Sequence, residues 1–243
     1  AILKYNNACG IASRSTVRES WDAALACDPV SAFGGVAVTN REIDTEAATE
    51  MDKIFLEVVM APSYTAKAVE ILRQKKNRII LLRKQSEADR VMFRSMLGGV
   101  LWQERDRANE SAADMRPVTV RHPSEDEYQD LVFANRIVKH SRSNAIVLAR
   151  GKQLCASGIG QTSRIDALRQ AIEKAHSFGL SIEGAVMASD AFFPFPDSVT
   201  TAHEAGITAV VQPGGSVRDQ ESIDYCNKNN VAMVFTGIRH FKH

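Results

Sequence analysis

The chain has 243 residues, of which 44% are hydrophobic and 24% charged, and its formal net charge is +1. This composition is that of a globular protein large enough to bury a core without disulfides, and it argues against disorder. The charge disfavours an extended nucleic-acid interface, and no apolar run reaches the ~20 residues of a membrane span. Four scattered cysteines without a CxxC pair disfavour a zinc site and indicate a reducing, cytoplasmic setting.

Val- and Ile-rich runs alternate with amphipathic segments along the chain. The predicted strands cover residues 1–5, 35–39, 57–60, 78–82, 145–149, 154–158, 184–188, 207–211 and 231–235. The predicted helices cover residues 16–27, 66–75, 125–140, 163–178, 197–205 and 219–229. Ser124 followed by Glu127 is typical of a capping box. The alternation predicts an α/β fold whose mostly parallel sheets are covered by helices on both faces. Because the stretch 84–123 is irregular, we expect a boundary near residue 123 between units 1–123 and 124–243.

Residues 157–164, Ser-Gly-Ile-Gly-Gln-Thr-Ser-Arg, follow a predicted strand and open a predicted helix. Glycines let backbone N–H groups approach an anion, and a helix N-terminus attracts negative charge. Gln161, Ser163 and Arg164 are therefore candidate anion-binding residues. A tight turn with Ser163 as the N-cap explains the loop equally well. The GxGxxG spacing is missing, so the loop does not indicate a dinucleotide cofactor.

Three further segments carry signals of a site. Residues 212–219 form a second glycine loop after an apolar strand, and two such loops favour a bound phosphate or carboxylate between them. Residues 189–197 hold three phenylalanines and two prolines, which indicates either a flat apolar pocket or a rigid core loop, with Asp197 capping the next helix. The C-terminal residues 237–243 have the composition of a solvated tail or of a tag remnant.

Six segments occur together in the order of one known family. They are residues 28–35, 143–147, 160–164, 187–197, 212–219 and 239–243, of which Ser-Asp-Ala-Phe-Phe-Pro-Phe at 189–195 is the most specific. Over nearly its whole length the chain resembles the AICAR transformylase domain of the bifunctional purine-biosynthetic family, which also carries IMP cyclohydrolase activity. The resemblance implies formyl transfer from 10-formyltetrahydrofolate to the amine of AICAR, giving FAICAR. It also implies two cytidine-deaminase-like α/β/α units without the zinc signature of true deaminases, a site at a homodimer interface, and a structural potassium ion.

The resemblance also assigns roles to individual residues. Lys4 matches the catalytic lysine, Tyr5 replaces a family histidine, and Asn144 matches the asparagine that binds the formyl oxygen. His243 matches the terminal histidine near the reacting centre. The positions that match nucleotide or folate contacts are Gly34, Ile165, Phe192, Pro194, Asp197, Ser216 and Arg239. We expect Lys4, partly desolvated, to transfer the proton and Asn144 to stabilise the oxyanion. Because a phenol is a poor base near pH 7, we expect Tyr5 to position the substrate or Lys4.

Two family features have no match in this sequence: the cyclohydrolase half, and an Arg-Tyr-Gly segment that helps to hold the nucleotide phosphate. We therefore expect either that this chain is a fragment of a longer protein or that another chain supplies the residues that bind the phosphate. Two other interpretations stay open. One is a catalytically silent homologue, suggested by Tyr5. The other is a nucleotide- or sugar-phosphate-binding enzyme of another reaction class that reuses the glycine loops. Neither nucleic acid nor a membrane is an expected partner.

Overall fold

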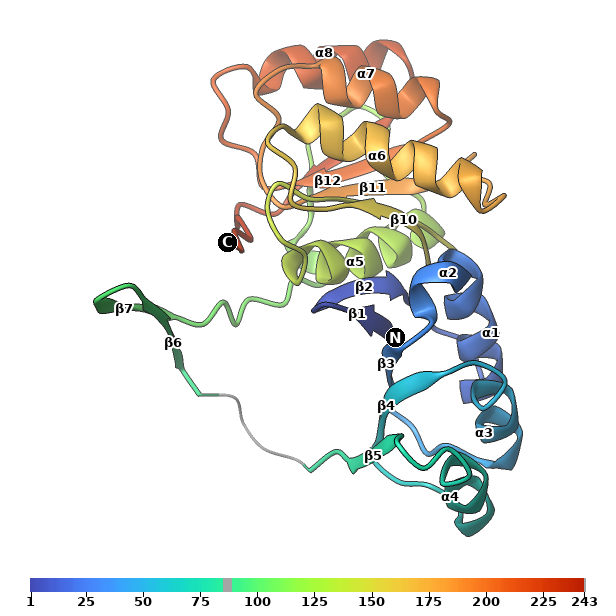
Figure 1. The fold of residues 1–243 in the computed structure, drawn as a ribbon. Coiled ribbons are helices and arrows are strands. Elements are labelled where there is room, and N and C mark those ends of the chain that lie inside the picture. The colour runs from blue at the N-terminus through green and yellow to red at the C-terminus, as the bar shows by residue number, and fades with distance from the viewer. Residues whose placement is uncertain (85–88, 243) are drawn as a thin grey trace.

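The computed structural model describes residues 1–84 and 89–242, which form two α/β units and a hairpin that extends away from both (Figure 1). The first sheet has the order β2-β1-β3-β4-β5; β3, β4 and β5 are parallel, and β1 is antiparallel to both neighbours. Its strands are β1 (Ile2–Lys4), β2 (Asn7–Gly10), β3 (Gly35–Val38), β4 (Leu56–Ala61) and β5 (Ile79–Leu82).

The helices of the first unit bury their apolar faces against this sheet. They are α1 (Val17–Cys27), α2 (Pro29–Ala32), α3 (Thr45–Met51) and α4 (Ala66–Leu72). Helices α1, α3 and α4 lie on the same side of the sheet (Figure 1). Trp21 and Leu72 pack with Leu56 of β4 in one apolar core. Thr16 is the N-cap of helix α1, and its capping box with Glu19 satisfies two N–H groups that the helix leaves free.

The second sheet has the order β10-β9-β11-β12-β13-β8. Its strands are β8 (Arg116–Pro117), β9 (Ile146–Arg150), β10 (Gln153–Gly158), β11 (Val186–Ser189), β12 (Ala209–Gln212) and β13 (Ala232–Phe235). Ile146, the first residue of β9, pairs with the last residues of both β10 and β11, Gly158 and Ser189. The loops that follow β10 and β11 therefore lie at the same edge as the segment that precedes β9.

Helices cover both faces of the second sheet, as the sequence predicts. Helix α5 (Glu125–Lys139) packs on one face in a core that also includes Cys27 of α1. Helices α6 (Arg164–Ser177), α7 (Asp197–Glu204) and α8 (Asp219–Lys228) contribute to the core on the other face. The predicted capping box of Ser124 and Glu127 at the start of α5 is confirmed. Within the described ranges, no helix combines the length and apolarity needed to cross a membrane.

The prediction of an α/β fold is confirmed, but the prediction of mostly parallel sheets is wrong. The parallel pairs are β3–β4, β4–β5, β11–β12 and β12–β13, and the other pairs of both sheets are antiparallel. The physical reason lies in two tight turns. Tyr5 and Asn6 join β1 to β2, and Gly151 and Lys152 join β9 to β10, all four with positive φ. Two-residue turns of this kind can connect only antiparallel strands.

The stretch 84–123 is more regular than expected. It holds the antiparallel hairpin of β6 (Val91–Met96) and β7 (Gly99–Glu104), followed by the short helix η1 (Ala112–Asp114). Strand β8 then pairs with β13 of the second sheet, although it precedes residue 123. The boundary near residue 123 stays a prediction.

Backbone contacts join the two units at β10. Leu154 N donates to the carbonyl oxygen of Ile11 at 2.9 Å, and Ala12 pairs with Gln153. At the far end of β10, Gly158 lies so close to α6 that a Cβ there would be 1.8 Å from the carbonyl oxygen of Ala167. Only glycine allows the strand and helix to approach this closely.

Candidate functional site

A cleft of about 470 Å³ opens between the two units. One wall comes from β1, β2 and the region of α2, and the other from the end of β10 and from α6. Its lining residues are Lys4, Tyr5, Asn7, Ala8, Cys9, Val30, Ser31, Phe33, Ser157, Ile159, Gln170 and Lys174. A cleft of this size suits a small-molecule ligand.

Lys4 presents its ammonium group at the end of β1. Lys4 Nζ donates to the carbonyl oxygen of Phe33 at 2.6 Å. Gly34 has φ +67°, and a Cβ at this position would lie 2.9 Å from Lys4 Nζ, so glycine suits both the backbone and the space. Tyr5 is 86% exposed, and the centroid of its ring lies 5.5 Å from Lys4 Nζ, within the range of a cation–π contact. The structure thus places Lys4, Tyr5 and Gly34 together.

Asn144 lies at the edge of the second sheet, just before β9. Its Nδ2 donates to the carbonyl oxygens of Gln161 at 3.0 Å and Thr162 at 3.1 Å. Both hydrogens of the amide are therefore used, and the group that Asn144 can offer to a ligand is the acceptor Oδ1. The expected role of Asn144 as a hydrogen-bond donor to an oxyanion does not fit this geometry.

The Asn144 turn adjoins the wall of the cleft through two glutamines. Gln161 exchanges backbone hydrogen bonds with Asn144, and its Nε2 donates to Gln170 Oε1 at 3.3 Å. Gln170, on α6, lines the cleft together with Lys4. Lys4 therefore lines the cleft, and Asn144 is linked to the wall of the same cleft through Gln161 and Gln170.

Arg164, a predicted anion-binding residue, faces a carboxylate of the protein itself. Its Nη2 lies 3.4 Å from Oδ1 of Asp190, and the side chains are 13% and 0% exposed. Burial lowers the pKa of Arg164, and the neighbouring Asp190 opposes this shift only in part. Ser163 accepts a hydrogen bond from Asp166 N as the N-cap of α6, which confirms the tight-turn interpretation of this loop. Anion binding by Gln161, Ser163 and Arg164 stays a prediction.

The two loops that follow β11 and β12 touch each other. The guanidinium of Arg218 lies 4.8 Å from the centroid of the Phe195 ring. Asp219 Oδ2 accepts hydrogen bonds from Gly215 N at 2.7 Å and Ser216 N at 3.0 Å, so a carboxylate of the chain occupies the N–H groups that an external anion would need. The N-cap of α7 is Pro196 and not Asp197; Asp197, the first helical residue, accepts a hydrogen bond from Ser198 N at 2.8 Å through its Oδ1.

The aromatic loop divides into buried and accessible residues. Phe193 is fully buried and belongs to the core of the second unit, as the rigid-loop interpretation requires. Phe192 is half-buried, and Pro194 and Asp197 are exposed. Ile165 packs against the same core at the start of α6. The residues of this loop that the sequence predicts as ligand contacts, Phe192, Pro194 and Asp197, are therefore accessible to a ligand, whereas Phe193 packs in the core.

The prediction that the C-terminal segment is a solvated tail is wrong at His240, which is buried. This ring is 2% exposed; its Nδ1 lies 2.6 Å from Asp106 Oδ2 and its Nε2 3.2 Å from Glu110 Oε2. Burial raises the pKa of Asp106, but the hydrogen bond with His240 and the nearby ammonium of Lys139 outweigh burial and lower the pKa below its usual value. Arg239 is exposed, and its guanidinium lies 5.5 Å from the ring centroid of Phe241. His243 lies outside the described residues.

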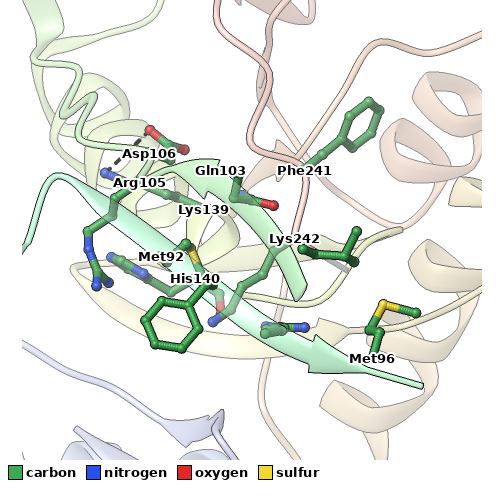
Figure 2. Close-up of a pocket in the computed structure, with 12 residues that line it drawn as sticks. Met92, Met96, Gln103, Arg105, Asp106, Lys139, His140, Phe241 and Lys242 are labelled. Carbon is green, nitrogen blue, oxygen red and sulfur yellow. Dashed lines mark hydrogen bonds and ion pairs between the residues drawn. The ribbon is translucent and has the colours of Figure 1, made fainter. Parts of the chain in front are cut away.

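A second cavity, of about 550 Å³, lies between the β6–β7 hairpin and the C-terminal segment (Figure 2). Met92, Phe93 and Leu101 of the hairpin and Phe241 of the tail give it apolar walls. Lys242 and His140 also line the cavity, and Lys242 Nζ donates to the carbonyl oxygen of His140 at 2.8 Å. No sequence signal predicted this cavity, because it depends on the unexpected hairpin.

Several groups were not predicted as site residues. Gln170 and Lys174 line the cleft, Asp28 pairs with Lys174, and Asp190 pairs with Arg164. One signal was present in the sequence. Gln170 and Lys174 stand four residues apart in the predicted helix 163–178 and therefore share a face. The four cysteines are buried and free, and burial raises the pKa of Cys27 to about 11. No cluster of three or more His, Cys, Asp or Glu side chains suited to a metal occurs among residues 1–84 and 89–242.

The chain has two α/β units with a ligand-sized cleft between them, and a lysine lines this cleft. These features are typical of an α/β protein that binds a small molecule. Sequence comparison specifies the family. The chain belongs to the AICARFT/IMPCHase bienzyme family, which it matches over residues 1–174.

Curated relatives match the whole chain. It is 64% identical over 243 residues to the "Bifunctional purine biosynthesis protein PurH" of Bacteroides thetaiotaomicron, covering 100% of this chain and 48% of the relative. It is 49% identical over 246 residues to the protein of the same name from Acetivibrio thermocellus, covering 99% of this chain and 47% of that relative. The chain thus spans about half the length of the curated relatives it matches.

Two solved structures overlap part of the chain. A dCMP deaminase from the cyanophage S-TIM5 has a TM-score of 0.35 and 16% identity, covering 46% of this chain and 98% of the deaminase. A diaminohydroxyphosphoribosylaminopyrimidine deaminase/5-amino-6-(5-phosphoribosylamino)uracil reductase from Thermotoga maritima has a TM-score of 0.30 and 18% identity, covering 44% and 34% of the two chains. At these scores the overlap does not define a common topology.

Proposed function

We propose that this chain catalyses formyl transfer from 10-formyltetrahydrofolate to the amine of AICAR, which gives FAICAR in purine biosynthesis. The observation that carries the proposal is the position of Lys4. In a chain of this family, Lys4 Nζ reaches a cleft of about 470 Å³, beside the backbone of Phe33 and Gly34. The reaction needs a proton-transfer group at such a place, because the amine is conjugated to its ring and is a poor nucleophile.

The proposed chemistry uses Lys4 as a proton relay. The AICAR nitrogen attacks the formyl carbon, the carbonyl electron pair moves to oxygen, and the tetrahedral intermediate then expels N10 of tetrahydrofolate. Lys4 gives a proton to the departing nitrogen and recovers one from the attacking amine, so that the charges balance. The hydrogen bond to the carbonyl oxygen of Phe33 orients the ammonium. Orientation of this kind contributes much of the rate enhancement of two-substrate reactions.

We assign Asn144 the role of an acceptor for the AICAR amine or carboxamide, since its two N–H groups are bound to Gln161 and Thr162. The oxyanion then needs another donor. The remaining proposed contacts are with nucleotide or folate, made by Gly34, Ile165, Phe192, Pro194, Asp197, Ser216 and Arg239. His243 stays proposed as a residue near the reacting centre.

We further propose that the active protein is a homodimer of chains with two cytidine-deaminase-like units, acting in the cytoplasm. The hairpin supports a homodimer, because Phe93 and Trp102, paired across β6 and β7, are 72% and 65% exposed. An isolated two-stranded hairpin is marginally stable in water, so a covering surface is needed. Replacing both residues with Lys and measuring mass by sedimentation tests this; an unchanged dimer would exclude the hairpin from the interface.

A structural potassium ion is the remaining proposal. Asp190 Oδ2 is a buried carboxylate oxygen without a hydrogen-bond partner among the described residues, and such an oxygen suits a hard cation. The ion would bind the carboxylate oxygen that Arg164 does not contact. Thermal unfolding in potassium and in tetramethylammonium salts checks it: equal midpoints would argue against a potassium site.

The main test measures formyl transfer by the protein expressed from its complete reading frame, with AICAR and 10-formyltetrahydrofolate as substrates. Turnover is expected, and calorimetric titration should show binding of both AICAR and a folate analogue. Folate affinity without turnover would favour the catalytically silent homologue. Affinity for phosphate compounds without folate affinity would favour an enzyme of another reaction class.

A further inference from the structure

An ion pair with a buried carboxylate joins the two units beside the cleft. Lys174 Nζ of α6 lies 2.6 Å from Oδ2 of Asp28, which precedes α2 in the first unit. The Asp28 side chain is 2% exposed and that of Lys174 is 32% exposed. Burial raises the pKa of Asp28, but hydrogen bonds from Lys174 and Ser31 outweigh burial and lower it below its usual value. Asp28 is therefore a charged carboxylate that depends on its partners.

The other oxygen of Asp28 fixes the start of α2. Ser31 N donates to Asp28 Oδ1 at 2.8 Å, which makes Asp28 the N-cap of this helix. Ala32, at the end of α2, is fully buried. Because α2 has a single turn, the position of its cap largely decides the position of the residues that follow it.

The residues that follow α2 hold the proposed catalytic lysine. The carbonyl oxygen of Phe33 accepts the hydrogen bond from Lys4 Nζ at 2.6 Å. Gly34 N donates to the carbonyl oxygen of Phe55 at 2.8 Å, and Gly34 provides the space that Lys4 Nζ fills. Lys4, Ser31 and Lys174 all line the same cleft.

We infer that Lys174 is a positioning residue for Lys4, acting across the two units through Asp28, α2 and the carbonyl group of Phe33. The inference rests on the proposed function, in which Lys4 transfers the proton. Removal of the Lys174 ammonium leaves the buried charge of Asp28 uncompensated, and the cap of α2 then moves toward water. The carbonyl oxygen of Phe33 moves with it, and Lys4 loses its fixed orientation.

Another contact between the units provides a matched control. Arg14 of the first unit donates to the carbonyl oxygen of Gly151 at 2.8 Å and to Gln153 Oε1 at 2.7 Å in the second. Neither Arg14 nor these partners line the cleft. Arg14→Ala therefore weakens the junction of the units without removing a side chain that bonds to Asp28 or α2, and it separates positioning from general stability.

The experiment compares Lys174→Met, Lys174→Arg, Asp28→Asn and Arg14→Ala in the protein expressed from its complete reading frame. Lys174→Met is expected to lower kcat about 10- to 100-fold with little change in the KM for AICAR, since misplacing a catalytic group by about 1 Å has effects of this size. Lys174→Arg keeps the charge and should recover most of the loss. Asp28→Asn should match Lys174→Met, and the double variant should lose no more than either single variant. Arg14→Ala should leave kcat unchanged.

An unchanged kcat in Lys174→Met, an equal loss in Arg14→Ala, or a rise confined to KM would overturn the inference. If the wild-type protein shows no formyl transfer, the proposed function fails, and acylation of Lys4 by a lysine reagent, followed by mass spectrometry, still tests the positioning. Lys4 should react faster in Lys174→Met than in wild type or Arg14→Ala. Equal rates would show that Lys174 does not hold Lys4.

Discussion

Arg164 and Asp190 face each other at 3.4 Å, away from solvent, where the loops after β10 and β11 meet. Arg164→Met is expected to lower the free energy of unfolding by about 3–5 kcal/mol, because it leaves the buried carboxylate unpaired. Urea unfolding measures this change. Arg169→Met is the control on the same helix: its pair with Asp166 is exposed, so its loss should cost at most about 1 kcal/mol. Equal effects would contradict the buried pair.

Lys4→Ala should lower kcat for formyl transfer by at least about 100-fold, the usual contribution of a positioned proton-transfer group. Steady-state kinetics at saturating substrates measures it. Lys53→Ala, which removes an exposed lysine paired with Glu50, is the control for loss of charge. Near-normal turnover in Lys4→Ala would show that Lys4 is not the proton-transfer group.

Tyr5→Phe should keep kcat/KM within about threefold of wild type, because the ring that contacts Lys4 remains. Tyr5→Ala removes the cation–π contact and should have the larger effect, of about 0.5–1 kcal/mol in transition-state stabilisation. Loss of turnover in Tyr5→Phe with normal substrate binding would mean that the hydroxyl group itself takes part in the reaction.

Asn144→Asp is expected to abolish AICAR binding and to lower the unfolding temperature, although the two side chains have nearly the same shape. A carboxylate cannot donate to the carbonyl oxygens of Gln161 and Thr162 and would be repelled by them. Calorimetric titration and thermal unfolding provide the measurements. Asn40→Asp, the same exchange at an exposed position outside the cleft and the hairpin, controls for the added charge. Unchanged binding in Asn144→Asp would show that these two hydrogen bonds do not hold the turn.

Glu127 should make folding stability depend on pH in the acid range. Burial raises its pKa, but hydrogen bonds from Arg121, Thr208 and Ser124 outweigh burial and place the pKa below the usual value of 4.5. A lowered folded-state pKa contributes stability above the unfolded-state pKa, and this contribution is lost as pH falls through the folded-state pKa.

Glu127→Gln should therefore lower the free energy of unfolding by about 1–3 kcal/mol at pH 7, and the difference from wild type should shrink below about pH 4. Urea unfolding at several pH values measures both effects. The control is Glu125→Gln, an exposed residue of the same helix. A difference that stays constant down to pH 3 would contradict the lowered pKa.

The sequence predicted the buried strands and long helices because their apolar spacing is local information. It did not predict β2, because Asn7–Gly10 is short and only half apolar, nor the antiparallel pairs that the turns at Tyr5-Asn6 and Gly151-Lys152 impose. The hairpin was missed because both of its strands are largely exposed and show no burial pattern.

The candidate site could be predicted only where motifs mark it. Lys4, Gly34 and Asn144 were found through family motifs, whereas the direction of the Asn144 amide depends on Gln161 and Thr162, which no spacing reveals. Asp28 and Lys174 are distant in sequence and meet only when the two units pack together. His240 is a similar case, since its carboxylate partners come from the stretch after the hairpin.

The contact of Gly158 with Ala167 has a consequence for the evolution of the cleft. The backbone of Gly158 is in direct contact with the backbone of α6 at Ala167. No side chain lies between them whose exchange could change the distance from β10 to α6. Gln170 and Lys174 lie on the following turns of that helix and line the cleft, so the contact at Gly158 also fixes the position of this wall relative to β10. New ligand preferences can therefore arise by exchanging side chains on α6, whereas widening the cleft by moving this helix would require the strand beneath it to move as well.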